Sequence, residues 1–358
     1  MLIALDRGQD VGEDPVMPRL GGPTEVRPLE ASSVTEEKTN TCSATLDLVA
    51  PPIPNSLAID LVGNKVAESI LKQSDFYMIA GRAQATFGNF RHDSATGRLH
   101  FEIAVAGGKK DSGWIVVDQI PHIRDSLDDL DIQVRWGDSQ IAFFEIKDDG
   151  SKQVFAAFTP DDVLMRRGRK ESVLGGFNSY LDLAIYDLLY VGIAKKSDTY
   201  ERLFAKGHLA RMEILAKEPQ RYPGARVSDE TYLFAFKVEP LMLKVFGPDS
   251  EINDDDLDFS YDNKRLVADA EKAMVSLLKP PYNKTLYPNY PKGTDGLYGS
   301  GLTAYTYAIS EGMSFRTAYG TIKGGRERDF TMSNEADFMM VKGNKVSFHI
   351  SGVDFAVR

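Results

Sequence analysis

The order of apolar segments between residues 188 and 278 constrains the fold of this chain more than any other feature. A short run of β-branched and aromatic residues precedes two helix-like runs, an alternating strand-like run and a longer helix-like run. These segments cover residues 188–193, 198–203, 208–217, 231–238 and 266–278. The last run stops before Pro280-Pro281, because proline cannot continue a helix. The order strand, helix, helix, strand, helix predicts an α/β unit.

Short alternating segments flank this unit on both sides. Residues 100–106 and 114–118 are strand-like, and residues 140–147 and 153–158 meet across Asp149-Gly150 in a hairpin pattern, whereas residues 64–73 predict a helix. We therefore expect an α+β fold. It would have a mobile tail over 1–45, a β-rich N-terminal domain over 46–165 that could serve recognition, the α/β unit within 171–295, and a β-rich region over 296–358.

Composition sets limits on the partners of the chain. With 358 residues, 42% of them hydrophobic and 26% charged, a soluble globular protein of two or three domains is expected at roughly 100–200 residues per domain. The formal net charge of −10 argues mildly against nucleic acid, because phosphate is contacted by Lys and Arg. The lone Cys42 excludes an internal disulfide and a cysteine-based zinc site, which fits a reducing cytoplasm. No signal peptide or membrane span is apparent.

One polar residue lies within the helix predicted over 266–278, and a second follows the turn that ends it. Glu271 lies on that helix, and Asn283 follows Pro280-Pro-Tyr. A rigid helix holds the carboxylate in place, and the prolines turn the chain so that Asn283 returns toward the core. A hard divalent cation binds such oxygen ligands and takes water and substrate at its other positions. Read alone, Glu271 is more simply a surface residue of an amphipathic helix.

Three further residues follow the strand over 188–193. Tyr190-Val-Gly192 places a tyrosine and a close-approach glycine on this strand, Arg202 lies on the next helix and His208 follows it. An arginine fork binds phosphate oxygens, and tyrosine or histidine can orient water or move a proton. Each residue alone also fits an ordinary structural role.

Together these residues resemble the GIY-YIG nuclease family, which includes homing endonucleases, excision-repair nucleases and some restriction enzymes. Tyr190-Val-Gly192 is similar to the second half of the motif that names the family, and Arg202 falls where the family carries its essential arginine. His208 fits the polar position that follows. Glu271 matches the metal-binding glutamate, and Pro280-Pro-Tyr-Asn283 resembles the closing segment. The resemblance spans residues from about 175 to 290 and implies a small three-stranded sheet with flanking helices.

The first tyrosine of the family motif has no obvious counterpart directly before Tyr190. Tyr180 lies ten positions upstream, after Gly175-Gly176-Phe177, whereas Tyr186 leaves too little room for a hairpin. Tyr180 is therefore our candidate for the first catalytic tyrosine.

The resemblance implies metal-dependent hydrolysis of nucleic-acid phosphodiester bonds, with DNA as the expected substrate and restriction or phage defence as the expected setting. Glu271 would hold Mg²⁺ or Mn²⁺, Arg202 would stabilise the developing charge, and Tyr190 or Tyr180 would position or deprotonate water. His208 could assist, and Asn283 would hold the other groups in place. The chain could form a homo-oligomer, and no membrane partner is expected.

Two alternatives remain beside this prediction. The chain could be a catalytically inactive nucleic-acid-binding or assembly module with the same fold, a reading that the negative net charge favours. Asp138 with Glu145-Ile-Lys147 also resembles a loose nuclease pattern, although a solvent-exposed hairpin explains it better. An active enzyme would need a local basic surface, for which the candidates are residues 166–170, Lys195, Lys196, Lys206, Arg211 and Lys217.

Overall fold

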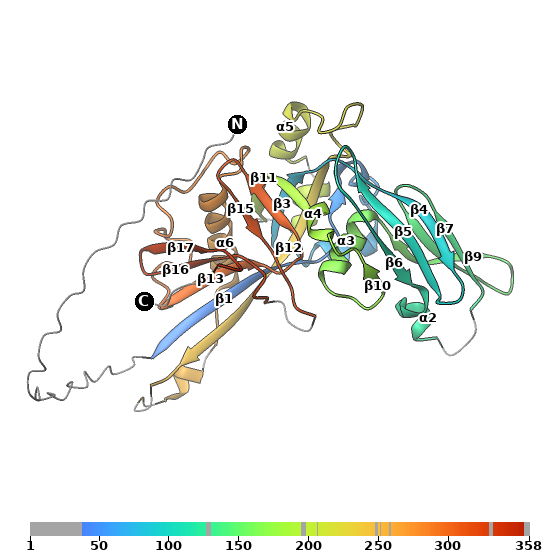
Figure 1. Ribbon diagram of the computed structural model, residues 1–358. Coiled ribbons are helices and arrows are strands. Elements are labelled where there is room, and N and C mark those ends of the chain that lie inside the picture. The colour runs from blue at the N-terminus through green and yellow to red at the C-terminus, as the bar shows by residue number, and fades with distance from the viewer. Residues whose placement is uncertain are drawn as a thin grey trace, which may run out of the picture. The chain divides into compact units, whose positions relative to one another are not determined.

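Three strands from distant parts of the chain lie side by side in the centre of one large sheet (Figure 1). We describe a computed structural model, in which residues 38–126, 130–194, 198–205, 207–247, 250, 252–257, 259–328 and 332–353 are described. The central strand is β3 (Phe76–Gly81), which pairs antiparallel with β11 (Ile185–Ile193) on one side and with β12 (Thr231–Val245) on the other. All of β3 is buried, as expected for a strand covered on both faces.

The sheet extends well beyond the three strands that we expected. Its order within the described residues is β15-β14-β11-β3-β12-β1-β13-β16-β17, and β2 pairs with β12 to make ten strands. The additional strands are β1 (Thr39–Leu48), β2 (Ile53–Pro54), β13 (Ala304–Ile309), β14 (Ser314–Thr317), β15 (Gly320–Lys323), β16 (Phe338–Lys342) and β17 (Lys345–His349). The pairs β1–β13 and β11–β14 are parallel, so the sheet is mixed. The α+β class is confirmed, but the residues after 296 extend this sheet and do not form a separate region.

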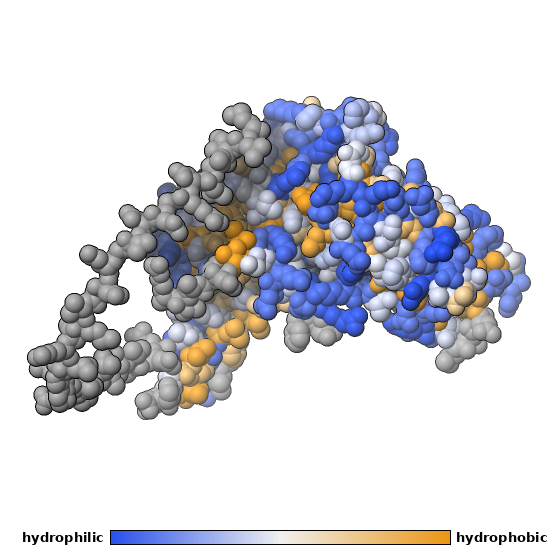
Figure 2. Space-filling model, in the orientation of Figure 1, coloured by the Kyte–Doolittle hydropathy of each residue, from blue (hydrophilic) through white to orange (hydrophobic). Residues whose placement is uncertain are grey.

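Strand β1 shows that the expected tail is too long. It begins at Thr39 and runs antiparallel to β12, with Thr39 opposite Val245 and Leu48 opposite Phe236. Residues 1–37 of the expected tail lie outside the described residues. The far end of the β1–β12 ribbon exposes apolar side chains, among them Leu243 and Val245, and Figure 2 shows hydrophobic surface there.

Three helices that the apolar periodicity of the sequence predicts are present. The helices expected over 64–73, 208–217 and 266–278 are α1 (Lys65–Leu71), α5 (Leu209–Lys217) and α6 (Asn263–Leu278). Asp262 caps α6, since its carboxylate accepts hydrogen bonds from the backbone N–H groups of Lys264 and Arg265. The buried side of α6 packs against the core formed by one face of the sheet. No helix in the described part of the chain is long and apolar enough to cross a membrane.

An insertion with its own core separates β3 from β11. One of its sheets joins β4 (Ala85–Asp93), β5 (Arg98–Val105), β6 (Lys110–Val116) and β10 (Leu174–Gly176), and the other joins β7 (Ile132–Trp136), β8 (Ile141–Ile146) and β9 (Lys152–Phe158). Three short helices complete it: α2 (Pro121–Arg124), α3 (Pro160–Gly168) and α4 (Tyr180–Leu183). Phe101 and Phe143 are fully buried in its core. The β8–β9 hairpin is the one that the sequence predicts.

A buried ion pair fastens both ends of this insertion. Arg82 directly follows β3, and its guanidinium lies 2.8 Å from the carboxylate of Asp161 on α3. The same guanidinium donates to the Leu183 carbonyl at 2.8 Å and to the Tyr186 hydroxyl at 2.9 Å, at the point where the chain enters β11. The Tyr186 hydroxyl in turn donates to Asp161 at 2.7 Å. Because every partner is satisfied, the buried charge is tolerated and the insertion has fixed ends.

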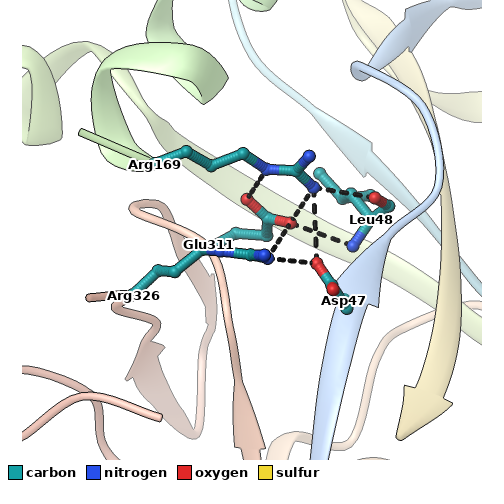
Figure 3. Close-up of polar contacts among 5 residues, drawn as sticks. All are labelled: Asp47, Leu48, Arg169, Glu311 and Arg326. Atoms are coloured by element: carbon teal, nitrogen blue, oxygen red, sulfur yellow. Dashed lines mark hydrogen bonds and ion pairs between the residues drawn. The ribbon is translucent and has the colours of Figure 1, made fainter. Parts of the chain in front are cut away.

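A second polar network ties four segments together around Glu311 (Figure 3). Glu311 follows β13 and is fully buried; its carboxylate accepts hydrogen bonds from the Leu48 backbone N–H at 3.0 Å and from Arg169 Nε at 3.0 Å. Arg169 also donates to the Leu48 carbonyl at 2.7 Å. Arg326 bonds Asp47 and lies 3.8 Å from Glu311. The network therefore connects β1, the end of α3 and the loops after β13 and β15.

Replacing Glu311 with alanine is expected to lower the free energy of unfolding by about 3–5 kcal/mol, because it removes the fully buried carboxylate and leaves Arg169 with the more distant Asp47, at 3.4 Å. Chemical denaturation measures this loss. Glu327→Ala is the matched control, since Glu327 pairs with Lys170 but its side chain is 44% exposed, and its loss should stay below about 1 kcal/mol. Equal losses in both variants would contradict the structural role that we assign to Glu311.

Candidate active site

Five of the six predicted site residues line one cavity of about 520 Å³. They come from four parts of the chain: Tyr190 from β11, Arg202 from the π-helical turn η3 (Glu201–Ala205), His208 from the start of α5, and Glu271 and Asn283 from α6 and the segment after it. The expected helix over 198–203 is thus this short π-helical turn. Such turns are frequent at functional sites.

A β-bulge in β11 sets the direction of Tyr190. The pairing with β3 shifts between Leu188, which is opposite Ala80, and Tyr190, which is opposite Ile79. Leu188 and Val191 therefore face the core that holds α6, whereas Leu189 and Tyr190 join the core on the other face of the sheet. A bulge commonly re-aims a side chain in this way. Without it, Tyr190 would be buried under α6.

The tyrosine that accompanies Tyr190 is Tyr77 on β3. The two rings stack with centroids 6.1 Å apart and an interplanar angle of 25°. The Tyr77 hydroxyl accepts a hydrogen bond from Arg202 Nε at 2.6 Å and lies 2.9 Å from His208 Nε2. Tyr77 thus joins three of the predicted residues, although we did not single it out from the sequence.

Tyr180, our candidate for the first catalytic tyrosine, lies elsewhere. It begins the short helix α4 in the insertion, its ring lies beneath the Arg167 guanidinium at 5.5 Å, and it packs close to Gly168 and Gly312. It does not line the cavity. Tyr77 therefore stands beside Tyr190 where we expected Tyr180, because the strand that pairs with β11 is β3 and not the segment that holds Tyr180.

His208 is a fixed hydrogen-bonding group and not a free base. As the N-cap of α5, its Nδ1 accepts the backbone N–H of Arg211 at 3.1 Å. Burial, together with the nearby Arg202 and Arg211, lowers the pKa of His208 to about 4, so the ring is neutral at neutral pH. A neutral ring whose Nδ1 accepts must carry its proton on Nε2. His208 Nε2–H therefore donates to the Tyr77 oxygen, as Arg202 does.

Two N–H donors thus converge on the Tyr77 oxygen and leave its own proton for another acceptor. Burial raises the pKa of Tyr77 above its ordinary value, so the hydroxyl keeps this proton in the protein as it stands. The two donors stabilise negative charge on the oxygen and would favour proton release once an acceptor is present. Tyr77 itself is fully buried and does not line the cavity, whereas Tyr190, which stacks on it, does.

The last position of the Tyr190-Val-Gly192 motif has no room for a side chain. A Cβ atom at this position would lie 2.6 Å from the Tyr77 hydroxyl and 2.7 Å from Cε1 of Tyr190. The missing side chain is therefore what lets the two tyrosines approach each other.

Gly192→Ala is expected to displace the two tyrosines, destabilise the protein by about 1–3 kcal/mol and abolish most of any activity of the site. Thermal unfolding and a cleavage assay measure the two effects. Gly137→Ala is the control, because a Cβ there would meet no atom within 4 Å. A Gly192→Ala protein with the stability and activity of the Gly137→Ala protein would contradict the close approach.

Asn283 acts on the backbone of β11. Its side-chain amide donates to the Val191 carbonyl at 2.8 Å, and its carbonyl oxygen accepts the Val191 N–H at 2.9 Å. The Tyr282 N–H donates to the Leu189 carbonyl at 3.1 Å. The segment after α6 therefore pairs with the edge of β11 beside Tyr190.

Glu271 provides the buried carboxylate of the cavity. Burial raises the pKa of the neighbouring Tyr287 to about 12, and the charge of Glu271 adds to this shift. Among the described residues, no group of three or more His, Cys, Asp or Glu side chains could enclose a metal ion. One buried carboxylate beside open volume fits Mg²⁺ or Mn²⁺, which keep water and substrate oxygens as most of their ligands. It does not fit structural zinc, which needs a closed ligand set.

Most of the basic residues that we expected near the site already have partners. Arg166 pairs with Asp162 and Glu171, both at 2.9 Å, and Lys170 pairs with Glu327 at 2.7 Å. Lys195, Lys196 and Lys206 lie outside the described residues. The competing Glu145 pairs with Lys147 and with His122 on the surface of the insertion. Basic groups that line the cavity are Arg202 and Lys284.

Comparisons of the chain with protein-family models, with curated proteins and with solved structures find no match.

Proposed function

We propose that the cavity between β11, η3, α5 and α6 hydrolyses phosphodiester bonds of nucleic acid with the help of Mg²⁺ or Mn²⁺. One observation carries the proposal. Tyr190, Arg202 and a buried glutamate line one cavity, although they come from β11, η3 and α6, and the fully buried Tyr77 of β3 stacks on Tyr190 and bonds Arg202 behind them. This is the set of groups that phosphoryl chemistry needs: a cation ligand, a charge-stabilising fork and a hydroxyl that can move a proton.

The arrangement of the strands also supports a core like that of the GIY-YIG nucleases. Tyr77 and Tyr190 stand on neighbouring antiparallel strands, Arg202 follows the second of them, and Glu271 lies on the helix after the next strand. With Tyr77 in place of Tyr180, each polar side chain that the resemblance names has a counterpart, although Asp75-Phe76 and not Gly-Ile precede Tyr77. We propose that residues 76–81 and 185–283 form this core.

Each side chain has a role that follows from its contacts. Arg202 donates one N–H to Tyr77, and its planar fork has further N–H groups for a phosphate oxygen. We assign the proton exchange with the attacking water to the tyrosine pair, because Tyr190 lines the cavity and the Tyr77 hydroxyl behind it is polarised by Arg202 and His208. Glu271 holds the cation, which when bound supplies Lewis-acid stabilisation of the phosphate. Asn283 and Gly192 keep Tyr190 and Tyr77 in position.

An inactive binding module with the same core is the second candidate function. The net charge of −10 and the internal pairing of Arg166 and Lys170 favour it, because both weaken the attraction of the surface for phosphate. Such a module would bind nucleic acid without cutting it.

Cleavage assays separate the two candidates. The full chain is incubated with supercoiled plasmid, single-stranded DNA and RNA in Mg²⁺, in Mn²⁺ and in EDTA, and strand breaks are followed on denaturing gels. Breaks that appear with the metals and vanish in EDTA support the enzyme. Binding without breaks in any metal supports the module and rejects hydrolysis.

A further inference from the structure

A second cavity, of about 590 Å³, adjoins the candidate active site. Asn283 lines both cavities, so the segment after α6 forms their common wall. The other lining residues include Lys279 and Leu286 from that segment, and Arg316 and Tyr319 from the β14–β15 hairpin. The hairpin belongs to the β-rich C-terminal part of the chain, for which the proposed function supplies no role.

Tyr319 is exposed yet held in a defined place. Its residue is 68% exposed at the tip of the hairpin. The turn is anchored, because the Thr317 hydroxyl donates to the Leu278 carbonyl at the end of α6 at 2.5 Å and accepts the Tyr319 N–H at 3.1 Å. Folding does not require an aromatic ring at such a position. A large exposed ring on a fixed turn beside a cavity is available to stack on a ligand.

Charge around Tyr319 favours an anion. The ammonium of Lys279 lies 4.8 Å above the ring of Tyr319, and Lys279 makes no ion pair within the described part of the chain. Arg316 and Arg221 also line the cavity, and both bridge to Asp187. Three cations thus face two carboxylates, those of Asp187 and Glu218.

We propose that this second cavity binds the nucleic-acid strand next to the bond that is cut, with a base stacked on Tyr319 and the adjacent phosphate held by Lys279. The proposal rests on the proposed function, since it assigns the flanking part of the same substrate. A strand offers both groups at once: every base has a face that stacks on an aromatic ring, and every nucleotide carries a phosphate. Because Asn283 lines both cavities, neighbouring nucleotides of one strand can occupy them on either side of the segment after α6.

The test is a binding titration of the full chain that carries Glu271→Gln, so that cleavage does not interfere. The probe is a fluorescein-labelled single-stranded DNA of about 20 nucleotides, read by fluorescence anisotropy in Mg²⁺, alone and annealed to its complement. Tyr319→Ala should weaken binding of the single strand about 5- to 100-fold, whereas Tyr319→Phe should bind as the parent does, because stacking needs the ring and not the hydroxyl. Tyr261→Ala is the control, as Tyr261 is 49% exposed and lines neither cavity.

Lys279 is tested by Lys279→Gly, since its φ of 45° suits glycine and the change removes the ammonium without backbone strain. It should weaken binding and reduce the slope of log Kd against log salt by about one. Equal affinities of the Tyr319→Ala and Tyr261→Ala proteins would overturn the proposal, as would a Tyr319→Phe protein as weak as Tyr319→Ala.

Cleavage by the unaltered chain distinguishes the two proposals. Cleavage with no effect of Tyr319 rejects the flanking site alone. Binding that depends on Tyr319, with no cleavage by the unaltered chain, rejects the enzyme and retains the site. A chain that neither binds nor cleaves the probes rejects both.

Discussion

Glu271→Gln is expected to reduce phosphodiester cleavage by about 10³-fold or more, because it removes the charged ligand of the cation while keeping the size of the side chain. The glutamine fits the same buried space on α6, so the thermal unfolding temperature should change little. Initial rates of plasmid nicking at matched Mg²⁺ concentrations measure the effect. An excess of metal should restore little activity, since a neutral amide is a poor ligand for a hard cation.

Glu213→Gln is the matched control for Glu271→Gln. Glu213 lines the same cavity from α5, but its carboxylate pairs with Lys217 at 2.6 Å on the helix surface. Its loss should leave the rate near that of the unaltered chain. Equal losses in the two variants would mean that cavity charge in general, and not a ligand at Glu271, supports activity. An unaffected Glu271→Gln protein would exclude Glu271 as the metal ligand.

Tyr77→Phe is expected to reduce cleavage by about 10²- to 10⁴-fold, the range for losing a group that transfers protons. The change removes the oxygen on which Arg202 and His208 converge. It also leaves both donors without that acceptor, so a loss of about 1–3 kcal/mol in the free energy of unfolding is expected. Rates should therefore be measured well below the unfolding transition.

Tyr180→Phe tests whether Tyr77 or Tyr180 is the first catalytic tyrosine. Tyr180 lies beside Arg167, Gly168 and Gly312, outside the cavity, so this variant should cleave as the unaltered chain does. The opposite pattern, with Tyr180→Phe inactive and Tyr77→Phe active, would restore Tyr180 as the first catalytic tyrosine and would falsify the role of Tyr77.

The part of the site that the sequence predicts is the part that is nearly continuous in the chain. Tyr190, Arg202, His208, Glu271 and Asn283 lie on successive elements whose apolar periodicity is strong, and they meet in one cavity. Tyr77 could not be placed beside Tyr190 in this way, because the residues of a strand do not show which strand it pairs with across a long insertion. A signal did exist: residues 76–80 form an unbroken apolar run before Gly81, as a strand covered on both faces requires.

Charge shows a second limit of prediction from sequence. Residues 166–170 look like a basic surface in the sequence, yet Arg166, Arg169 and Lys170 each contact a carboxylate from another residue. Two of those carboxylates, Glu311 and Glu327, come from far along the chain. Such pairing depends on tertiary contacts, and so does the growth of the sheet from three expected strands to ten.

The insertion between β3 and β11 leaves and rejoins the large sheet at neighbouring positions. Its two ends leave neighbouring strands, with Gly81 directly opposite Asp187, so a different module could be grafted between them without moving Tyr77 or Tyr190. The graft must bring its own counterpart of Asp161, because Arg82 would otherwise be a buried charge without a partner. Exchange of this segment, with that counterpart kept, should therefore leave the arrangement of the candidate site intact.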